Sequence, residues 1–169
     1  MNALVLSTLQ LDTITCSAAT SACAKGGEWQ MVMKLLTTMG NGEIASNTIT
    51  CNAAISSCEK VGKWERALKL LIITAQASLQ MDTITYSAAM SSCDKGGSWQ
   101  KALRLFGTLQ QTRMKANTIT YNVAISACGR EGWPLGLKLL DAMGQAGLET
   151  DKITYSAATS ACGKCREWQ

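Results

Sequence analysis

The sequence predicts an all-α fold, a right-handed α-solenoid made of helical hairpin repeats of about 35 residues each. The first observation is a tetrapeptide that recurs at intervals of 35, 35, 35 and 34 residues. Its copies are Thr13-Ile-Thr-Cys, Thr48-Ile-Thr-Cys, Thr83-Ile-Thr-Tyr, Thr118-Ile-Thr-Tyr and Lys152-Ile-Thr-Tyr. The second is an apolar stripe at helical spacing after each copy, and the third is a tryptophan that opens another amphipathic stretch. A lone hairpin of this kind cannot bury its apolar face, so the units are expected to stack.

The tetrapeptide divides the chain into six segments. Residues 1–12 are expected to end a preceding incomplete repeat, with Asp12 in its closing position. Four units follow at 13–47, 48–82, 83–117 and 118–151, and a partial fifth unit occupies 152–169. The fourth unit lacks one residue just before Trp133. We therefore expect the chain to belong to a longer array.

The first half of each unit is expected to form a short helix. In the second unit, Cys51, Ile55 and Cys58 lie four and three residues apart and so share one helix face. The Asp or Asn that closes the preceding unit, or the opening Thr, can cap the helix. Glycine is expected to end it in a left-handed conformation at one shared position. These glycines are Gly27, Gly62, Gly97 and Gly132.

The second half of each unit is expected to form a helix that begins at a tryptophan. The column comprises Trp29, Trp64, Trp99, Trp133 and Trp168. Exposed tryptophans could stack on bases, but their fixed place favours burial in the core of their own unit. A polar loop then ends each full unit in Asp or Asn. The first helices should line the concave surface of the stack and the second helices its outside.

The composition limits the classes of function. The formal net charge of +4 permits a nucleic-acid partner without requiring one. The chain has no histidine, which removes the commonest general base and metal ligand. Its eight cysteines mostly hold equivalent places in the units, so they are expected to be small buried hydrophobes in a reducing compartment. No apolar run is long enough to span a membrane, and the first residues do not form a recognisable targeting segment.

No catalytic or cofactor site is expected. Cys162 and Cys165 form the only C-x-x-C motif, and a structural zinc site needs a second pair of ligands. No phosphate-binding loop or nucleophile–base pair is present, and the carboxylates are few and expected to be scattered over loops. We therefore expect no enzyme activity, no metal and no cofactor.

The units resemble pentatricopeptide repeats of the P type over residues 13–169. The resemblance rests on the 35-residue period, the opening Thr120-Tyr121-Asn122, the leucine-rich second helix and the closing Asp or Asn. The chain departs from the family where Cys16 and Cys51 replace the usual tyrosine. It also lacks the usual proline before the closing residue. The related tetratricopeptide repeats carry their tryptophan in the first helix instead.

The resemblance implies binding of single-stranded RNA, with one base read by each repeat. The fifth and last residues of the units would read the base edges: Ser17, Asn47, Asn52, Asp82, Ser87, Asn117, Asn122, Asp151 and Ser156. The second residues would sandwich the bases: Ile14, Ile49, Ile84, Ile119 and Ile153. A basic column at the end of the first helix would contact phosphates: Lys25, Lys60, Lys95, Arg130 and Lys164. In the family an Asn–Asp pair prefers uracil and a Ser–Asn pair adenine, which implies the target A-U-A-U.

Two other interpretations stay open. Asn, Asp and Ser could simply cap helices, and the basic column could balance helix C-termini. The groove could instead bind a peptide, as a scaffold of the tetratricopeptide type does. The fifth and last residues alternate together (Ser with Asn, then Asn with Asp), which capping does not require, although duplication of a two-unit block would also produce this.

The resemblance also implies a cellular setting. Members of the family act in mitochondria or chloroplasts, in RNA processing, stability, editing or translation. We accordingly expect an organellar monomer that binds single-stranded RNA and acts with RNA-processing enzymes in trans.

Overall fold

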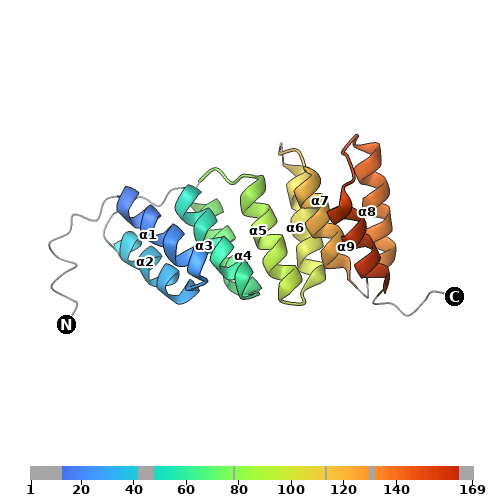
Figure 1. Cartoon of the computed structure of the whole chain (residues 1–169). Coiled ribbons are helices and arrows are strands. Elements are labelled where there is room, and N and C mark those ends of the chain that lie inside the picture. Colours follow the sequence, from blue (N-terminus) through green and yellow to red (C-terminus); the bar gives the residue numbers. More distant parts are fainter. Residues whose placement is uncertain (1–12, 42–47, 78, 113, 130–131, 164–169) are drawn as a thin grey trace.

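The computed structural model describes residues 13–41, 48–77, 79–112, 114–129 and 132–163 (Figure 1). These residues form helices and connecting turns and contain no β-strand. The helices are α1 (Thr13–Gly26), α2 (Trp29–Asn41), α3 (Thr48–Lys60), α4 (Trp64–Gln76), α5 (Thr83–Lys95), α6 (Trp99–Gln111), α7 (Thr118–Cys128), α8 (Trp133–Gln145) and α9 (Lys152–Gly163). None of them is long and apolar enough to cross a membrane.

The helices form two layers in a single row, with α1 at one end and α8 and α9 at the other (Figure 1). The odd-numbered helices each contact the next odd-numbered helix. The even-numbered helices pack mainly against odd-numbered helices. Successive even-numbered helices meet through side chains, as Arg66 of α4 does on Trp29 of α2 and Lys101 of α6 on Trp64 of α4. The odd-numbered helices thus form one continuous layer, called the inner layer below, and the even-numbered helices form the outer layer. This arrangement confirms the expected all-α solenoid and places the first helix of every unit on the inner side.

Small side chains allow the two layers to approach closely. Ala67 and Ala102 are completely buried where the second helices meet the core, and Gly136 takes the same place in α8. Cys58, Cys93 and Cys128 are buried free thiols at one repeated position. Burial raises the pKa of both Cys93 and Cys128 to about 11, so these thiols stay protonated at neutral pH. These three cysteines therefore act as the small buried hydrophobes that their spacing predicts.

The expected left-handed glycine is found in three units and is displaced in the fourth. Gly27, Gly62 and Gly97 have φ values of 77°, 61° and 72°. Gly132 has φ −109°, and Gly129 takes the positive φ of 45° instead. The prediction for Gly132 was therefore wrong. The fourth unit is one residue short, so α7 ends at Cys128 and the chain turns earlier.

Trp29 and Trp64 contact the following unit as well as their own, which the sequence-based prediction did not include. The ring of Trp64 lies against the next unit, because a Cβ atom added to Gly96 would be 2.3 Å from its Cδ1 atom. The ammonium of Lys101 lies 3.5 Å from the centre of the same ring. The guanidinium of Arg66 lies 5.6 Å from the ring centre of Trp29. Each of these half-buried rings thus joins its unit to the following one through packing and cation–π contact.

Candidate functional site

The junction between the second and third units brings the predicted reading residues Asn52 and Asp82 together. The Asn52 amide nitrogen lies 3.3 Å from both carboxylate oxygens of Asp82. The Thr85 hydroxyl lies 2.5 Å from the Asn52 amide oxygen and 2.8 Å from Asp82 Oδ1, and it can donate to one of them at a time. The amide of Asn52 is therefore held with its nitrogen towards Asp82 and its oxygen towards Thr85.

Asp82 also begins helix α5. Its Oδ1 accepts a hydrogen bond from the Thr85 backbone N–H at 2.8 Å, and the Asp82 N–H donates to the Thr85 hydroxyl in return. Partial burial alone would raise the pKa of Asp82, but the hydrogen bonds from Thr85 and Asn52 outweigh it and lower that pKa. The carboxylate is thus held ionised, and its second oxygen also accepts from the Asn52 amide.

The junction between the fourth and fifth units repeats this geometry. The Asn122 amide nitrogen lies 3.4 Å from Asp151 Oδ1, and the Thr154 hydroxyl lies 2.7 Å from the Asn122 amide oxygen. The backbone N–H of Thr154 donates to the same Asp151 oxygen at 2.8 Å, and this bond is the largest cause of the lowered pKa of Asp151. Two equivalent positions in the array therefore hold the same three-residue network.

The junction between the third and fourth units is arranged differently. Ser87 donates its hydroxyl to the backbone oxygen of Thr83 in its own helix. Asn117 caps α7 by accepting from the Thr120 N–H at 3.0 Å, and neither residue bonds to the other. Of the remaining predicted readers, Ser17 is within 2.7 Å of the Thr50 hydroxyl and Ser156 is exposed. Asn47 lies outside the described residues.

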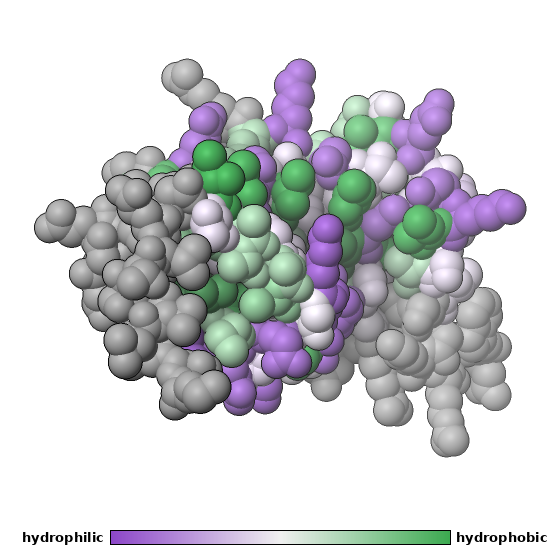
Figure 2. Space-filling model, turned by 60° about the vertical axis from the view of Figure 1, so that its left-hand side comes forward, coloured by the Kyte–Doolittle hydropathy of each residue, from purple (hydrophilic) through white to green (hydrophobic). Residues whose placement is uncertain are grey.

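The predicted sandwiching residues are all exposed. Ile14, Ile49, Ile84, Ile119 and Ile153 have between 62% and 77% of their surface accessible to solvent. Each stands in the first turn of an inner helix, next to the closing residue of the preceding unit. On the face shown in Figure 2, hydrophobic patches alternate with hydrophilic side chains along the stack. An exposed isoleucine at the same place in every unit has no packing role that the described structure reveals.

A hollow of about 370 Å³ opens where the third, fourth and fifth units meet on the inner side. It is lined by Ser91, Asp94, Asn122, Val123, Ser126, Ile153, Ser156 and Ala157. This solvent-accessible hollow is therefore lined by two predicted reading residues, a predicted sandwiching isoleucine and one carboxylate.

The basic column makes contacts from unit to unit. The Lys60 ammonium donates a hydrogen bond to the backbone oxygen of Lys25, at the end of α1. The Lys95 ammonium forms an ion pair with Glu59 at 3.0 Å. The Lys25 side chain is exposed and makes no hydrogen bond or ion pair with the other described residues. Arg130 and Lys164 lie outside the described residues.

Two groups of residues at this site were missed by the sequence reasoning. The third residue of each unit supplies the threonine that fixes the readers, as Thr85 and Thr154 do, and its presence in all five units was the available signal. Glu59 and Asp94 lie in inner helices, not in loops as expected. They fall at one repeated position, twelve residues into their units. Among the described residues, no cluster of three or more His, Cys, Asp or Glu side chains is placed to hold a metal.

Comparison with known proteins matches the sequence to models of one family of repeats, and it matches the fold to solved structures of helical-repeat proteins. A sequence model described as pentatricopeptide repeat domain matches residues 74–131. A second, described as PPR repeat, matches residues 49–72 and 119–148. Together these matches cover more than half of the chain. No curated protein matches it.

Several solved structures share the fold. The pentatricopeptide repeat protein PPR10 in complex with an 18-nucleotide psaJ RNA element matches with a TM-score of 0.81 and 22% identity, over 91% of this chain and 23% of that chain. PPR10 from maize matches with a TM-score of 0.79 and 17% identity, over 95% of this chain and 24% of that chain. The PPR domain of Arabidopsis thaliana protein-only RNase P 1, in complex with tRNA, matches with a TM-score of 0.77 and 9% identity, over 89% of this chain and 80% of that chain. The chain thus spans about a quarter of the length of PPR10.

Proposed function

Because the chain belongs to the pentatricopeptide repeat family, we propose that its inner face binds single-stranded RNA, with one base at each junction between units. The observation that carries the proposal is the Asn52–Asp82 pair, held side by side at a junction and repeated in Asn122–Asp151. Helix capping explains the acidic or amide closing residue, but it does not require an asparagine bonded to it from the preceding unit.

The geometry supports different roles for the repeated positions, with stacking on the isoleucines and base reading by the fifth and closing residues. The exposed isoleucines offer apolar surface on which any base can stack, at roughly 1–3 kcal/mol per base. The Asn–Asp pair offers an amide donor beside a carboxylate acceptor. Uracil presents a carbonyl beside an N–H, which complements that pair. The shorter Ser87 keeps its hydroxyl on its own helix and leaves more room at its junction, which favours a purine.

The proposed target, written 5′ to 3′ along the chain, is therefore A-U-A-U. The first A depends on Ser17 with Asn47, the second base on Asn52 with Asp82, the third on Ser87 with Asn117, and the fourth on Asn122 with Asp151. The chain acts in this proposal as a non-catalytic monomer that occupies its site on an organellar transcript and works with processing enzymes in trans. A peptide in the same groove is the competing proposal, and the exposed isoleucine column favours RNA over it.

Selection of binders from a randomised RNA pool tests the proposal. The variant Asn122→Ser with Asp151→Asn converts the last full junction to the Ser–Asn kind. We expect its preference at the fourth base to change from U to A by about tenfold, or about 1.4 kcal/mol. The helix cap should survive, because Asn117 caps α7 in the same way.

The matched control makes the same conversion in the second unit, with Asn52→Ser and Asp82→Asn. It should change the second base and leave the fourth unchanged. A wild-type chain that selects no RNA sequence, or a conversion that moves no base preference, would contradict the proposal.

A further inference from the structure

Two of the inner helices carry a carboxylate in the last turn, facing the following unit. Glu59 in α3 and Asp94 in α5 are half-buried and occupy equivalent positions. At the same position α1 has Ala24, which is buried in the core. The first unit therefore lacks the acid that the next two units have.

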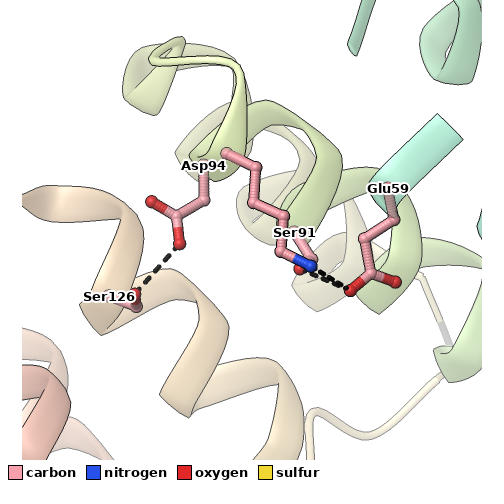
Figure 3. A network of polar contacts seen from close by, with 5 residues as sticks. Glu59, Ser91, Asp94 and Ser126 are labelled. Atoms are coloured by element: carbon pink, nitrogen blue, oxygen red, sulfur yellow. Dashed lines mark hydrogen bonds and ion pairs between the residues drawn. The ribbon is translucent and has the colours of Figure 1, made fainter. Parts of the chain in front are cut away.

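Both carboxylates bond to the unit that follows them (Figure 3). Glu59 Oε1 accepts from the Ser91 hydroxyl at 2.9 Å and from the Lys95 ammonium at 3.0 Å. Asp94 Oδ2 accepts from the Ser126 hydroxyl at 2.9 Å. Lys95 is thereby neutralised by an acid of the preceding unit, although its place in the basic column would otherwise suit a phosphate.

The carboxylates lie beside the proposed RNA site. Asp94 and Ser91 line the same hollow as Asn122, Ile153 and Ser156. A separate hollow between α1 and α3, which includes Ala24 at the position of the two acids, is lined by Ser21, Ala24, Lys25, Ala53, Ser56 and Lys60, with two cations and no acid among them. The hydrogen bond from Lys60 to a backbone oxygen leaves its charge uncompensated. An anionic backbone would thus meet two ammonium groups without an acid at the first junction, an ammonium paired with Glu59 at the second, and the Asp94 carboxylate at the third.

We propose that phosphate binding along the groove is uneven. Lys25 and Lys60 bind the RNA backbone at the first junction. Glu59 holds Lys95 in an ion pair and so keeps it from binding a phosphate, and Asp94 repels a phosphate at the third junction. This inference rests on the proposed RNA binding. Its consequence is that the acids weaken the sequence-independent share of affinity, so that base contacts at the Asn–Asp junctions decide more of the binding.

The test measures affinity for A-U-A-U RNA by fluorescence anisotropy, over a series of salt concentrations, with the 169-residue chain. Glu59→Gln keeps an oxygen for Ser91 and releases Lys95. We expect it to bind about three- to tenfold more tightly at low salt, with the log–log salt slope steeper by about 0.7 for the one phosphate gained. Adding Lys95→Gln to this variant should return the affinity to within about twofold of wild type.

Two controls separate this effect from net charge and from folding. Asp141→Asn removes one negative charge from an exposed site on the outer helix α8 and should leave affinity unchanged. Lys25→Gln should weaken binding and make the slope shallower by about 0.7. Thermal unfolding of every variant shows whether it is folded.

The inference is overturned if wild type binds RNA but Glu59→Gln binds no more tightly, or if Asp141→Asn gives the same gain. It is also overturned if the gain survives the loss of Lys95. If wild type binds no RNA at any salt concentration, the proposed function itself fails, and this result is distinct from the others.

Discussion

The three junctions whose closing residues the structure describes are of two kinds, and they differ in whether hydrogen bonds connect one unit to the next. At Asn52–Asp82 and Asn122–Asp151, an amide crosses from one unit to the closing residue and threonine of the next. At Ser87–Asn117, the serine bonds to its own helix and the asparagine only caps the next helix. We call a junction closed where the fifth and closing residues are hydrogen-bonded to each other, as at the first two pairs, and open where they are not, as at Ser87–Asn117.

The difference teaches that the capping role and the cross-junction role are separable. Asp82 and Asn117 cap in the same way, since each accepts from the N–H of the threonine three residues later. The asparagines at the fifth position bond to both the threonine and the closing residue of the next unit, whereas Ser87 donates to its own helix. Ser17, also at the fifth position, lies 2.7 Å from the Thr50 hydroxyl of the next unit. The third-position threonine is therefore contacted from the preceding unit by Asn52, Asn122 and Ser17, but not by Ser87.

The largest effect should come from removing the closing side chain at each kind of junction. Asp82→Ala loses both the cap of α5 and the bond to Asn52, so we expect a loss of about 2 kcal/mol in unfolding free energy. Asn117→Ala loses the cap alone and should cost about 1 kcal/mol. Urea unfolding followed by circular dichroism gives both values. Equal losses would show that the bond across the junction contributes nothing.

Exchanging the fifth residue tests the bridge without touching the cap. Asn52→Ser should cost about 1 kcal/mol, because the Thr85 hydroxyl and the Asp82 carboxylate each lose a partner. The reciprocal Ser87→Asn is the matched control at the open junction, and we expect its stability to stay within about 0.5 kcal/mol of wild type. A destabilised control would mean that the open junction has no room for the longer side chain.

The smallest effect should be a pH dependence that belongs to the closed junction. The pKa of Asp82 is lowered in the folded chain, so its contribution is complete above the ordinary value near 4. It is lost as the pH falls through the lowered value. Asp82→Asn keeps the cap but not the charge, so wild type should be more stable by about 0.5 kcal/mol at pH 7.

The difference between wild type and Asp82→Asn should shrink as the pH falls below 4, measured by thermal unfolding at each pH. Asn117→Asp is the complementary variant, and it should acquire the same pH dependence at α7. A difference that stays constant down to pH 2 would show that the carboxylate charge does not stabilise the junction.

Much of this architecture could be predicted because it depends on short sequence patterns that recur in every unit. The period places the helices, since α3, α4, α5 and α6 begin at the expected threonines and tryptophans. The capping residues and the small residues at helix crossings were also visible, because they act within a few positions of themselves. The glycine turn failed only at Gly132, where a missing residue moved the turn to Gly129.

The sequence by itself determined the helices, their two-layer stacking and the columns of side chains that could face a common groove. Only the tertiary structure decided which side chains meet across that groove. Glu59 and Lys95 are 36 residues apart, and their pairing depends on how one hairpin is set against the next. Trp64 joins the following unit for the same reason. A repeat records what each unit contains, whereas the offset between neighbouring units is fixed by packing, and that offset determines the partners.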